Sequence, residues 1–142
     1  ALAMCLVECR SFSSRDFARF HPGGSLGKRL YTRVSDVYDG TNRPCITREA
    51  GIRPVILAMS KGRLGAVAIV DGEERLEGII TDGVTAKDVM SKSPKTISED
   101  ELAYNAYRMM EQNSITQLVV VDKDRHYKGM VHIHDILREG VV

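Results

Sequence analysis

One histidine lies in a segment rich in proline and glycine. His21 is followed by Pro22, Gly23 and Gly24. Proline and glycine at this density predict a loop over residues 21–27 rather than regular structure. An imidazole titrates near neutral pH, so His21 suits acid–base transfer of a proton to or from a substrate. Residue type alone equally fits a loop histidine that caps a helix or faces solvent.

A second pair of histidines lies near the carboxyl end of the chain. His132 and His134 alternate in a segment that predicts a strand, so their side chains share one face. Two imidazoles on one face would suit an anionic sugar or a phosphate. They would also suit a metal ion, but no third ligand is evident, and we predict no metal site. The alternative interpretation is a strand-end pair bonded to the backbone.

Composition limits the classes of function. The chain has 142 residues and a net charge of +1, without a basic stripe, which disfavours nucleic acid and anionic membranes as partners. No apolar run approaches the roughly 20 residues that span a bilayer. The three cysteines, Cys5, Cys9 and Cys45, lack zinc spacing, and we interpret them as small packing residues in a reducing cytosol.

The elements that position these residues come from an internal repeat. Residues 46–83 align without a gap onto residues 97–134, and Met59 matches Met110. A period of about fifty residues is the scale of a supersecondary unit that cannot bury its own apolar face. We therefore expect two pseudo-symmetric halves that close one core and leave clefts between them.

Hydrophobic periodicity predicts the same order of elements in both halves. In the first half, a strand, a helix and a hairpin are expected at residues 45–47, 52–61, 65–70 and 76–81. In the second half, the same elements and a closing helix are expected at residues 96–97, 102–112, 117–121, 127–133 and 135–139. Upstream, a first helix ends near Arg10, and a short helix capped by Ser13 or Ser14 runs to Phe20. The predicted fold class is α/β (α+β).

The two copies differ after Gly83. The second half proceeds into a helix, whereas the first half reaches the start of the next copy within a few residues. Either the helix was lost in evolution or a segment of the protein is missing from this sequence. We favour the second, because a core built by pseudo-symmetry would be left open. The chain also opens inside a helix without an initiator methionine, which indicates a fragment of a longer protein.

Two groups of motifs resemble a known family. A Val-Asp pair before each turn and a Gly-x-(Ile/Val)-(Thr/His) ending of each hairpin are similar to a tandem pair of cystathionine-β-synthase (CBS) domains. The HPGG motif within residues 20–30 and the His-x-His-Asp-Ile-Leu motif within residues 132–142 resemble the C-terminal half of arabinose-5-phosphate isomerases, which join a sugar-isomerase (SIS) domain to a CBS pair. The resemblance covers essentially the whole chain. It implies an SIS helix and linker, a first CBS motif and a second CBS motif at residues 1–33, 34–84 and 85–142.

The resemblance also implies what the parent protein does. It would convert D-ribulose 5-phosphate to D-arabinose 5-phosphate for 3-deoxy-octulosonate (Kdo), and thus for lipopolysaccharide or capsule synthesis, in the cytoplasm and without a cofactor. His21 would be catalytic in the intact parent enzyme, whereas this fragment lacks the SIS domain and is expected to be inactive alone. The implied assembly is a homodimer of CBS pairs within a tetrameric parent.

For the CBS pair, the resemblance implies a regulatory ligand site between the repeats. In such pairs a hydroxyl pairs with phosphate oxygens, a carboxylate takes the ribose diol, and a helix N-terminus favours an anion. Each half departs from this pattern, because His132 replaces a hydroxyl residue and Val84 replaces an aspartate. The expected ligand-binding residues are Thr81, Ile97, Thr116, His132, His134 and Asp135.

The expected effector is a nucleotide or nucleotide-sugar such as CMP-Kdo. Its cytidine ribose would meet Asp135, and its carboxylate would meet His132. Two alternatives remain. The pair is an oligomerisation scaffold with no ligand, or it is a generic adenosine-nucleotide sensor.

Overall fold

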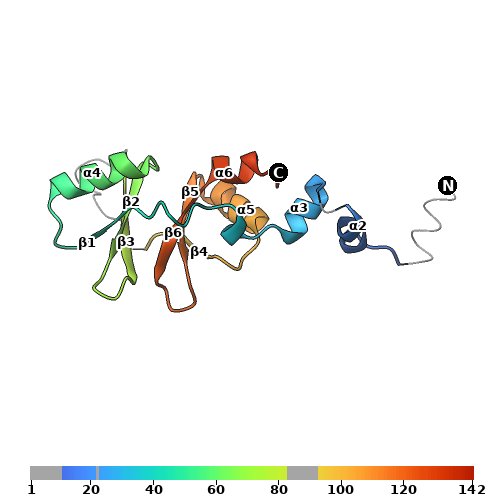
Figure 1. The fold of residues 1–142 in the computed structure, drawn as a ribbon, viewed down its shortest axis with the longest axis horizontal. Coiled ribbons are helices and arrows are strands. Elements are labelled where there is room, and N and C mark those ends of the chain that lie inside the picture. The colour runs from blue at the N-terminus through green and yellow to red at the C-terminus, as the bar shows by residue number, and fades with distance from the viewer. Residues whose placement is uncertain (1–10, 22, 83–92) are drawn as a thin grey trace.

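The computed structural model describes residues 11–21, 23–82 and 93–142. The expected helix over residues 1–10, with Cys5 and Cys9, and the repeat boundary at Val84 lie outside the described residues. Two similar α/β units lie side by side, and two short helices project from one end of the pair (Figure 1).

Each repeat forms a three-stranded sheet, in which the first two strands pair in parallel and the last two form an antiparallel hairpin. The first repeat contains β1 (Cys45–Thr47), α4 (Ile52–Gly62), β2 (Ala66–Val70) and β3 (Leu76–Thr81). The second contains β4 (Thr96–Ser98), α5 (Ala103–Asn113), β5 (Gln117–Val121), β6 (Tyr127–His132) and α6 (Ile133–Arg138). The predicted order of these elements is confirmed, with boundaries that differ by no more than two residues.

One apolar core joins the two sheets. Successive side chains of a strand point to opposite faces, so alternate residues of β2 and β5 meet in this core. Its members are Ala66, Ala68, Val70, Leu76, Val119, Val121, Tyr127 and Met130. The other face of the second sheet packs on α5 and α6 through Leu118, Val120 and Val131. The inner strands are therefore buried on both faces, which explains their continuous apolar sequences.

Two reciprocal hydrogen bonds join the repeats at their hairpins. The N–H of Leu76 donates to the carbonyl of Arg125 at 3.1 Å, and the N–H of Tyr127 donates to the carbonyl of Glu74 at 2.9 Å. Donors and acceptors occupy equivalent positions of the two repeats, so the pair of bonds follows the pseudo-two-fold symmetry. Tyr127 is 1% exposed, and its hydroxyl donates to the Pro44 carbonyl at 3.3 Å.

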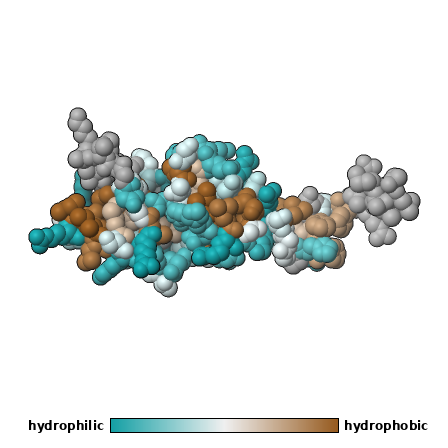
Figure 2. Space-filling model, turned by 90° about the horizontal axis from the view of Figure 1, so that it is seen from above, coloured by the Kyte–Doolittle hydropathy of each residue, from teal (hydrophilic) through white to brown (hydrophobic). Residues whose placement is uncertain are grey.

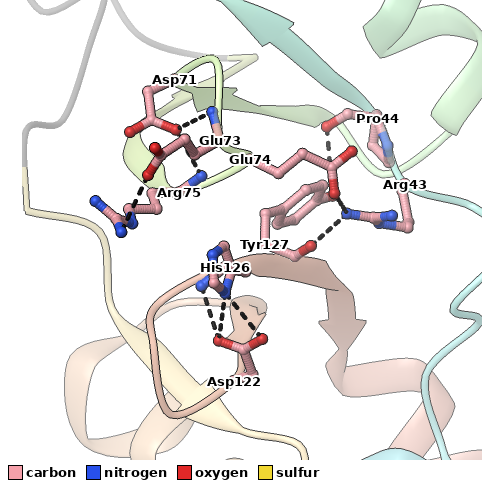
Figure 3. A network of polar contacts seen from close by, with 9 residues as sticks. All are labelled: Arg43, Pro44, Asp71, Glu73, Glu74, Arg75, Asp122, His126 and Tyr127. Carbon is pink, nitrogen blue, oxygen red and sulfur yellow. Dashed lines mark hydrogen bonds and ion pairs between the residues drawn. The ribbon is translucent and has the colours of Figure 1, made fainter.

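An aspartate organises each hairpin turn (Figure 3). Asp71 accepts the N–H groups of Glu73 at 2.8 Å and Arg75 at 2.9 Å. Asp122 accepts the equivalent N–H groups two and four residues further along the chain. Hydrogen bonds to a carboxylate favour its charged form, so they lower the pKa of both groups, with the bond from Arg75 the main cause for Asp71 and the bond from His126 the main cause for Asp122.

The N-terminal helices are α2 (Ser14–Phe20) and α3 (Ser25–Tyr31). Ser13 caps α2, as predicted, because its hydroxyl accepts the N–H of Asp16 at 3.2 Å. The loop predicted over residues 21–27 is wrong at its end, since α3 begins at Ser25. Gly24 supplies the N-cap, and Gly27 is buried within α3 rather than part of a turn.

Basic side chains of α3 hold it against the second repeat. The Nε of Arg29 donates to the carbonyl of Val141 at 3.2 Å, and its guanidinium lies 5.0 Å from the ring centroid of Tyr104. The ammonium of Lys28 donates to the carbonyl of Glu139. The 3₁₀ turn η1 (Val34–Asp36) then leads the chain into the first repeat.

The helices of the two repeats differ in their exposure. On α5, Ala103 and Ala106 are fully buried, and the helix packs against α3 and α6. On α4, Ile52, Ile56 and Leu57 are 67%, 57% and 55% exposed. We call these three residues the α4 patch. Figure 2 shows hydrophobic surface at the end of the molecule where α4 lies.

The structure bears on two predictions made from composition, one on the cysteines and one on membrane-spanning segments. Cys45 is exposed on the edge strand β1, so the prediction that the cysteines pack in the core is wrong for this residue. Among the described residues, no helix has the length and apolar character needed to cross a bilayer.

Substitution of Gly65 tests the geometry at the start of β2. Gly65 has φ of +61°, and a Cβ there would lie 2.6 Å from Oδ1 of Asp82. A left-handed backbone costs a non-glycine residue about 1–2 kcal/mol, so we expect Gly65→Ala to lower the free energy of unfolding in urea by at least about 1 kcal/mol. Gly72→Ala is the control, because a Cβ there meets no atom within 4 Å. Equal effects of the two substitutions would contradict this account.

Candidate functional site

A cavity of about 480 Å³ opens between the two repeats. The strands β3 and β5 contribute walls, together with the segment before β4 and the end of α5. Its inner wall consists of the less exposed residues Ile79, Thr81, Pro94, Ile115, Gln117 and Val119. Its rim consists of the exposed residues Asp82, Ser93, Lys95, Ser114 and Thr116. The inner wall is mainly apolar, and the rim carries hydroxyls, an ammonium and a carboxylate.

The local structure of β3, β5 and the end of α5 determines which side chains line the cavity. Alternation along β3 and β5 puts Ile79 and Thr81 on one face of the first sheet, and Gln117 and Val119 on the facing side of the second. The helix α5 ends at Asn113, and its C-cap residue Ser114 has a left-handed φ of 52°. The chain therefore turns sharply from the helix into β5, and this turn forms part of the rim.

The structure brings only part of the predicted ligand set together. Thr81 and Thr116 both line the cavity, one from each repeat. Ile97 is 5% exposed and belongs to the core of the second repeat. His132, His134 and Asp135 lie at the start of α6 and are not among the residues that line this cavity.

The repeat symmetry explains this division. Thr81 and His132 occupy equivalent positions, at the ends of β3 and β6. A pseudo-two-fold axis that relates the repeats sends equivalent positions to opposite sides of their junction. Thr81 pairs with Ala66 across its hairpin, and His132 pairs with Gln117. Thr81 lines this cavity and His132 does not, so the cavity takes this position from the first repeat only.

The predicted residues at α6 are engaged with one another. His132 is the N-cap, and its Nδ1 accepts the N–H of His134 at 3.2 Å. Asp135 accepts the N–H of His132 at 3.3 Å and an N–H of the Arg138 guanidinium at 2.8 Å. The two imidazoles stack with ring centroids 5.0 Å apart. For the His132 ring this is the backbone-bonded arrangement that the sequence left open as the alternative, whereas the His134 ring is exposed.

His21 lies apart from the cavity. It is exposed at the C-cap of α2, and its ring centroid lies 4.9 Å from that of Phe17. The carbonyl of His21 accepts the N–H of Gly24 at 3.1 Å. The catalytic role of His21 in a parent enzyme stays a prediction.

Sequence reasoning missed several lining residues. Lys95 reads as part of a solvated turn, and it is exposed, but it also contributes to the rim. Gln117 is a polar residue at the inward-facing start of a strand whose other residues are buried and apolar. That mismatch between residue type and strand face is the signal that could have identified it.

The structure also groups Asp122, Asp124 and His126, whose ligand atoms lie within 4.8 Å of one another. Spacing did not predict this cluster. The carboxylate of Asp122 already accepts N–H groups of the turn and lies 3.2 Å from Nδ1 of His126. The turn geometry therefore accounts for the cluster without a metal ion.

A family model described as CBS domain matches residues 34–83 and 86–141. The arabinose 5-phosphate isomerase KdsD of Yersinia pestis is 38% identical over 157 positions, which cover 100% of this chain and 48% of that protein. Among solved structures, the CBS pair of MJ0100 in complex with 5′-methylthioadenosine and S-adenosyl-L-methionine is 28% identical, with a TM-score of 0.63 over 75% of this chain and 94% of that one. CBSX2 in complex with AMP is 17% identical, with a TM-score of 0.66 over 75% and 94%, which supports the fold alone.

The alignment with curated relatives adds two facts. The chain spans about half the length of the curated relatives it matches. The Yersinia pestis alignment also extends over 157 positions, whereas the chain has 142 residues, so the relative carries residues without a counterpart here. Their number suits a helix and its linker, and the place of that segment after Gly83 stays a prediction.

His132, at the N-terminus of α6, is expected to make the stability of the fold depend on pH. Burial lowers the pKa of His132 from the ordinary 6.5, the neighbouring His134 lowers it further, and Asp135 opposes both. The unfolded chain then binds a proton at higher pH than the folded chain does. Stability is therefore full above about pH 6.5, falls as the pH drops toward the lowered value, and is constant below it.

We expect His132→Asn to reduce this fall, because asparagine caps a helix but does not titrate. Urea midpoints measured between about pH 5 and 7.5 provide the test. His21→Asn is the control, since it removes an exposed histidine outside α6. An unchanged pH dependence in His132→Asn would show that this cap does not titrate with folding.

Proposed function

Because the chain belongs to the CBS domain family, we propose that it is the regulatory ligand-binding part of an arabinose-5-phosphate isomerase. The observation that carries the proposal is the cavity to which both repeats contribute polar and apolar walls. Its effector is a nucleotide or a nucleotide-sugar. The nucleoside ligands of the MJ0100 pair, which shares 28% identity with this chain, support that choice of chemical class.

The cavity has the chemistry that such a ligand needs. Its volume of about 480 Å³ lies within the range of small-molecule pockets. Apolar side chains such as Ile79, Ile115 and Val119 suit the faces of a nucleobase. The ammonium of Lys95 and the rim hydroxyls suit a phosphate or a sugar carboxylate. CMP-Kdo carries a base, a phosphate and a carboxylate, which match these groups.

The ribose diol requires a different residue from the one expected. Asp135 already accepts hydrogen bonds from His132 and Arg138. Asp82 lines the cavity and is exposed. We assign the diol-accepting role to Asp82, because a carboxylate can accept both hydroxyls of a cis-diol.

The remaining parts of the proposal concern the complete protein. An SIS domain of the parent chain would isomerise D-ribulose 5-phosphate to D-arabinose 5-phosphate for the Kdo pathway in the cytoplasm, with His21 contributed by the linker. The exposed α2 side chains Phe17 and Phe20, at 43% and 71%, suit contact with that domain. The CBS pair would transmit occupancy of its cavity to the isomerase.

Isothermal titration with CMP-Kdo, AMP and ATP tests ligand binding. We expect CMP-Kdo to bind, and Lys95→Ala to weaken its binding about fivefold, because the variant lacks a charge-assisted hydrogen bond at an exposed rim. Lys123→Ala is the matched control, because Lys123 is exposed and lies outside the cavity lining. Binding of AMP and ATP without CMP-Kdo would instead favour a generic adenosine-nucleotide sensor. No binding of any of the three would refute the sensor function.

The exposed α4 patch favours a second candidate function. Three apolar side chains more than half exposed on one helix are typical of a surface that another molecule covers. A homodimer of CBS pairs that buries this patch would act as an oligomerisation scaffold for the parent enzyme. This function requires no ligand in the cavity.

The scaffold function predicts a change in mass rather than in affinity. We expect Ile56→Glu to convert a dimer to a monomer in light scattering, because an unpaired carboxylate would be buried at the interface. Ile56→Val keeps an apolar side chain at the same position and should remain a dimer. A chain that is monomeric without any substitution would contradict the scaffold function.

A further inference from the structure

The helices α4 and α5 occupy equivalent positions in the two repeats but have different neighbours. In the second repeat, α5 packs against α3 and α6, whereas α4 packs on β1 and β2 of its own sheet. Ala103 and Met110 of α5 are fully buried in the core that includes Ile136 of α6. Their equivalents on α4 are Ile52, which is 67% exposed, and Met59, which is partly exposed. The apolar surface of α4 therefore corresponds to a surface that α6 helps to cover in the second repeat.

A groove beside α4 continues this surface. It has a volume of about 400 Å³ and is bounded by the last turns of α4 and by residues next to β2 and β3. We call it the α4 groove, and its lining residues are Ile56, Met59, Ser60, Arg63, Gly65 and Asp82. Ile56 belongs both to this groove and to the α4 patch. A groove that continues into exposed apolar side chains is the surface on which an amphipathic helix buries its apolar face.

The chain at the end of β3 makes the same backbone hydrogen bond with which α6 begins. In the second repeat, the N–H of Ile133, the first residue of α6, donates to the carbonyl of Thr116 at 2.8 Å. In the first repeat, the equivalent N–H of Asp82 donates to the carbonyl of Gly65, also at 2.8 Å. The N-cap position of α6 corresponds to Thr81, and threonine is a residue type that caps helices. The first repeat therefore has the start of a helix at one end of the α4 groove.

We infer that the α4 groove is the docking site of an amphipathic helix of the same chain, supplied by residues that follow β3 in the longer relatives and have no counterpart here. The alignment with the Yersinia pestis relative has 157 positions and this chain has 142 residues, so that relative carries at least 15 additional residues in the aligned region. That number exceeds the 6 residues of α6 and leaves room for a linker. The inference does not depend on the effector function. It assigns the groove side of α4 to the chain itself rather than to a second copy.

A helix that docks as α6 does would cover Ile56 and leave Leu57 exposed. Ile56 lines the groove, and its equivalent Tyr107 packs against the core that contains Ile136. Leu57 is not among the residues that line the groove, and its equivalent Arg108 is exposed. The two neighbouring side chains are 57% and 55% exposed in this chain. They therefore form a matched pair of positions for a test.

Thiol labelling at these two positions tests the inference. The additional residues of the Yersinia pestis relative are inserted after Gly83, and Ile56→Cys and Leu57→Cys are each compared with and without the insertion. We expect the insertion to slow the reaction of residue 56 with iodoacetamide at least about tenfold, because the helix must open before the thiol reacts, and to change the rate at residue 57 less than about twofold. Peptide mass spectrometry separates these thiols from the exposed Cys45. An insertion of glycine and serine of the same length is the control and should slow neither reaction.

Each of three outcomes would overturn the inference. Equal rates at residue 56 with and without the insertion would show that no helix docks in the groove. Slow labelling of residue 56 in the unaltered chain that becomes faster on dilution would assign the groove to a second copy. If the inserted chain shows no cooperative unfolding in urea, the same residues are added to the unaltered chain as a free peptide at millimolar concentration. A peptide that fails to slow the labelling of residue 56 would then reject the docking site.

Discussion

Each repeat has a sheet that cannot bury both of its faces, and the junction between the sheets is the constraint on which the fold depends. All five residues of β2 are buried, although α4 covers only one face of their sheet. The second face meets Val119, Val121 and Tyr127 of the other repeat. The reciprocal bonds at Leu76 and Tyr127 hold this contact in register, because a slip by one residue would turn the apolar set toward water. This junction therefore also fixes the positions of the cavity walls.

Local patterns predict the strands and helices well, and they do so for a physical reason. Alternation and helical spacing record which side of an element faces the core, and both are properties of neighbouring residues. Thr81 lines the cavity and Asp135 does not. This difference depends on how the two hairpins meet across a pseudo-two-fold axis, and the sequence of one repeat does not contain that information. The start of α3 at Ser25 was missed because packing outweighs the low helix propensity of glycine. The roles of Lys95 and Gln117 depend on neighbours from distant segments.

Some residues of the hairpins are the same in the two repeats, whereas residues at the cavity end of the strands differ. Val70 matches Val121, Asp71 matches Asp122, and Gly78 matches Gly129, and all lie along the hairpins that meet at the junction. The repeats differ at the opposite ends of the same strands. There, Gly65 and Ala66 of the first repeat correspond to Thr116 and Gln117 of the second, which line the cavity. The two repeats therefore share a backbone fold, but only the second repeat carries a hydroxyl and an amide at these two positions.

The junction and the start of α6 respond to different ranges of pH. Turn hydrogen bonds lower the pKa of Asp71 and Asp122, so their contribution to stability is full above about pH 4 and is lost only as the pH falls through the lowered values. The cap at His132 responds at higher pH, where both turns remain charged and bonded. The N–H of Ile133 in α6 donates to the carbonyl of Thr116 on the cavity rim at 2.8 Å. The backbone at the start of α6 is therefore bonded directly to one edge of the cavity, whereas the charges of the two turns change only at lower pH.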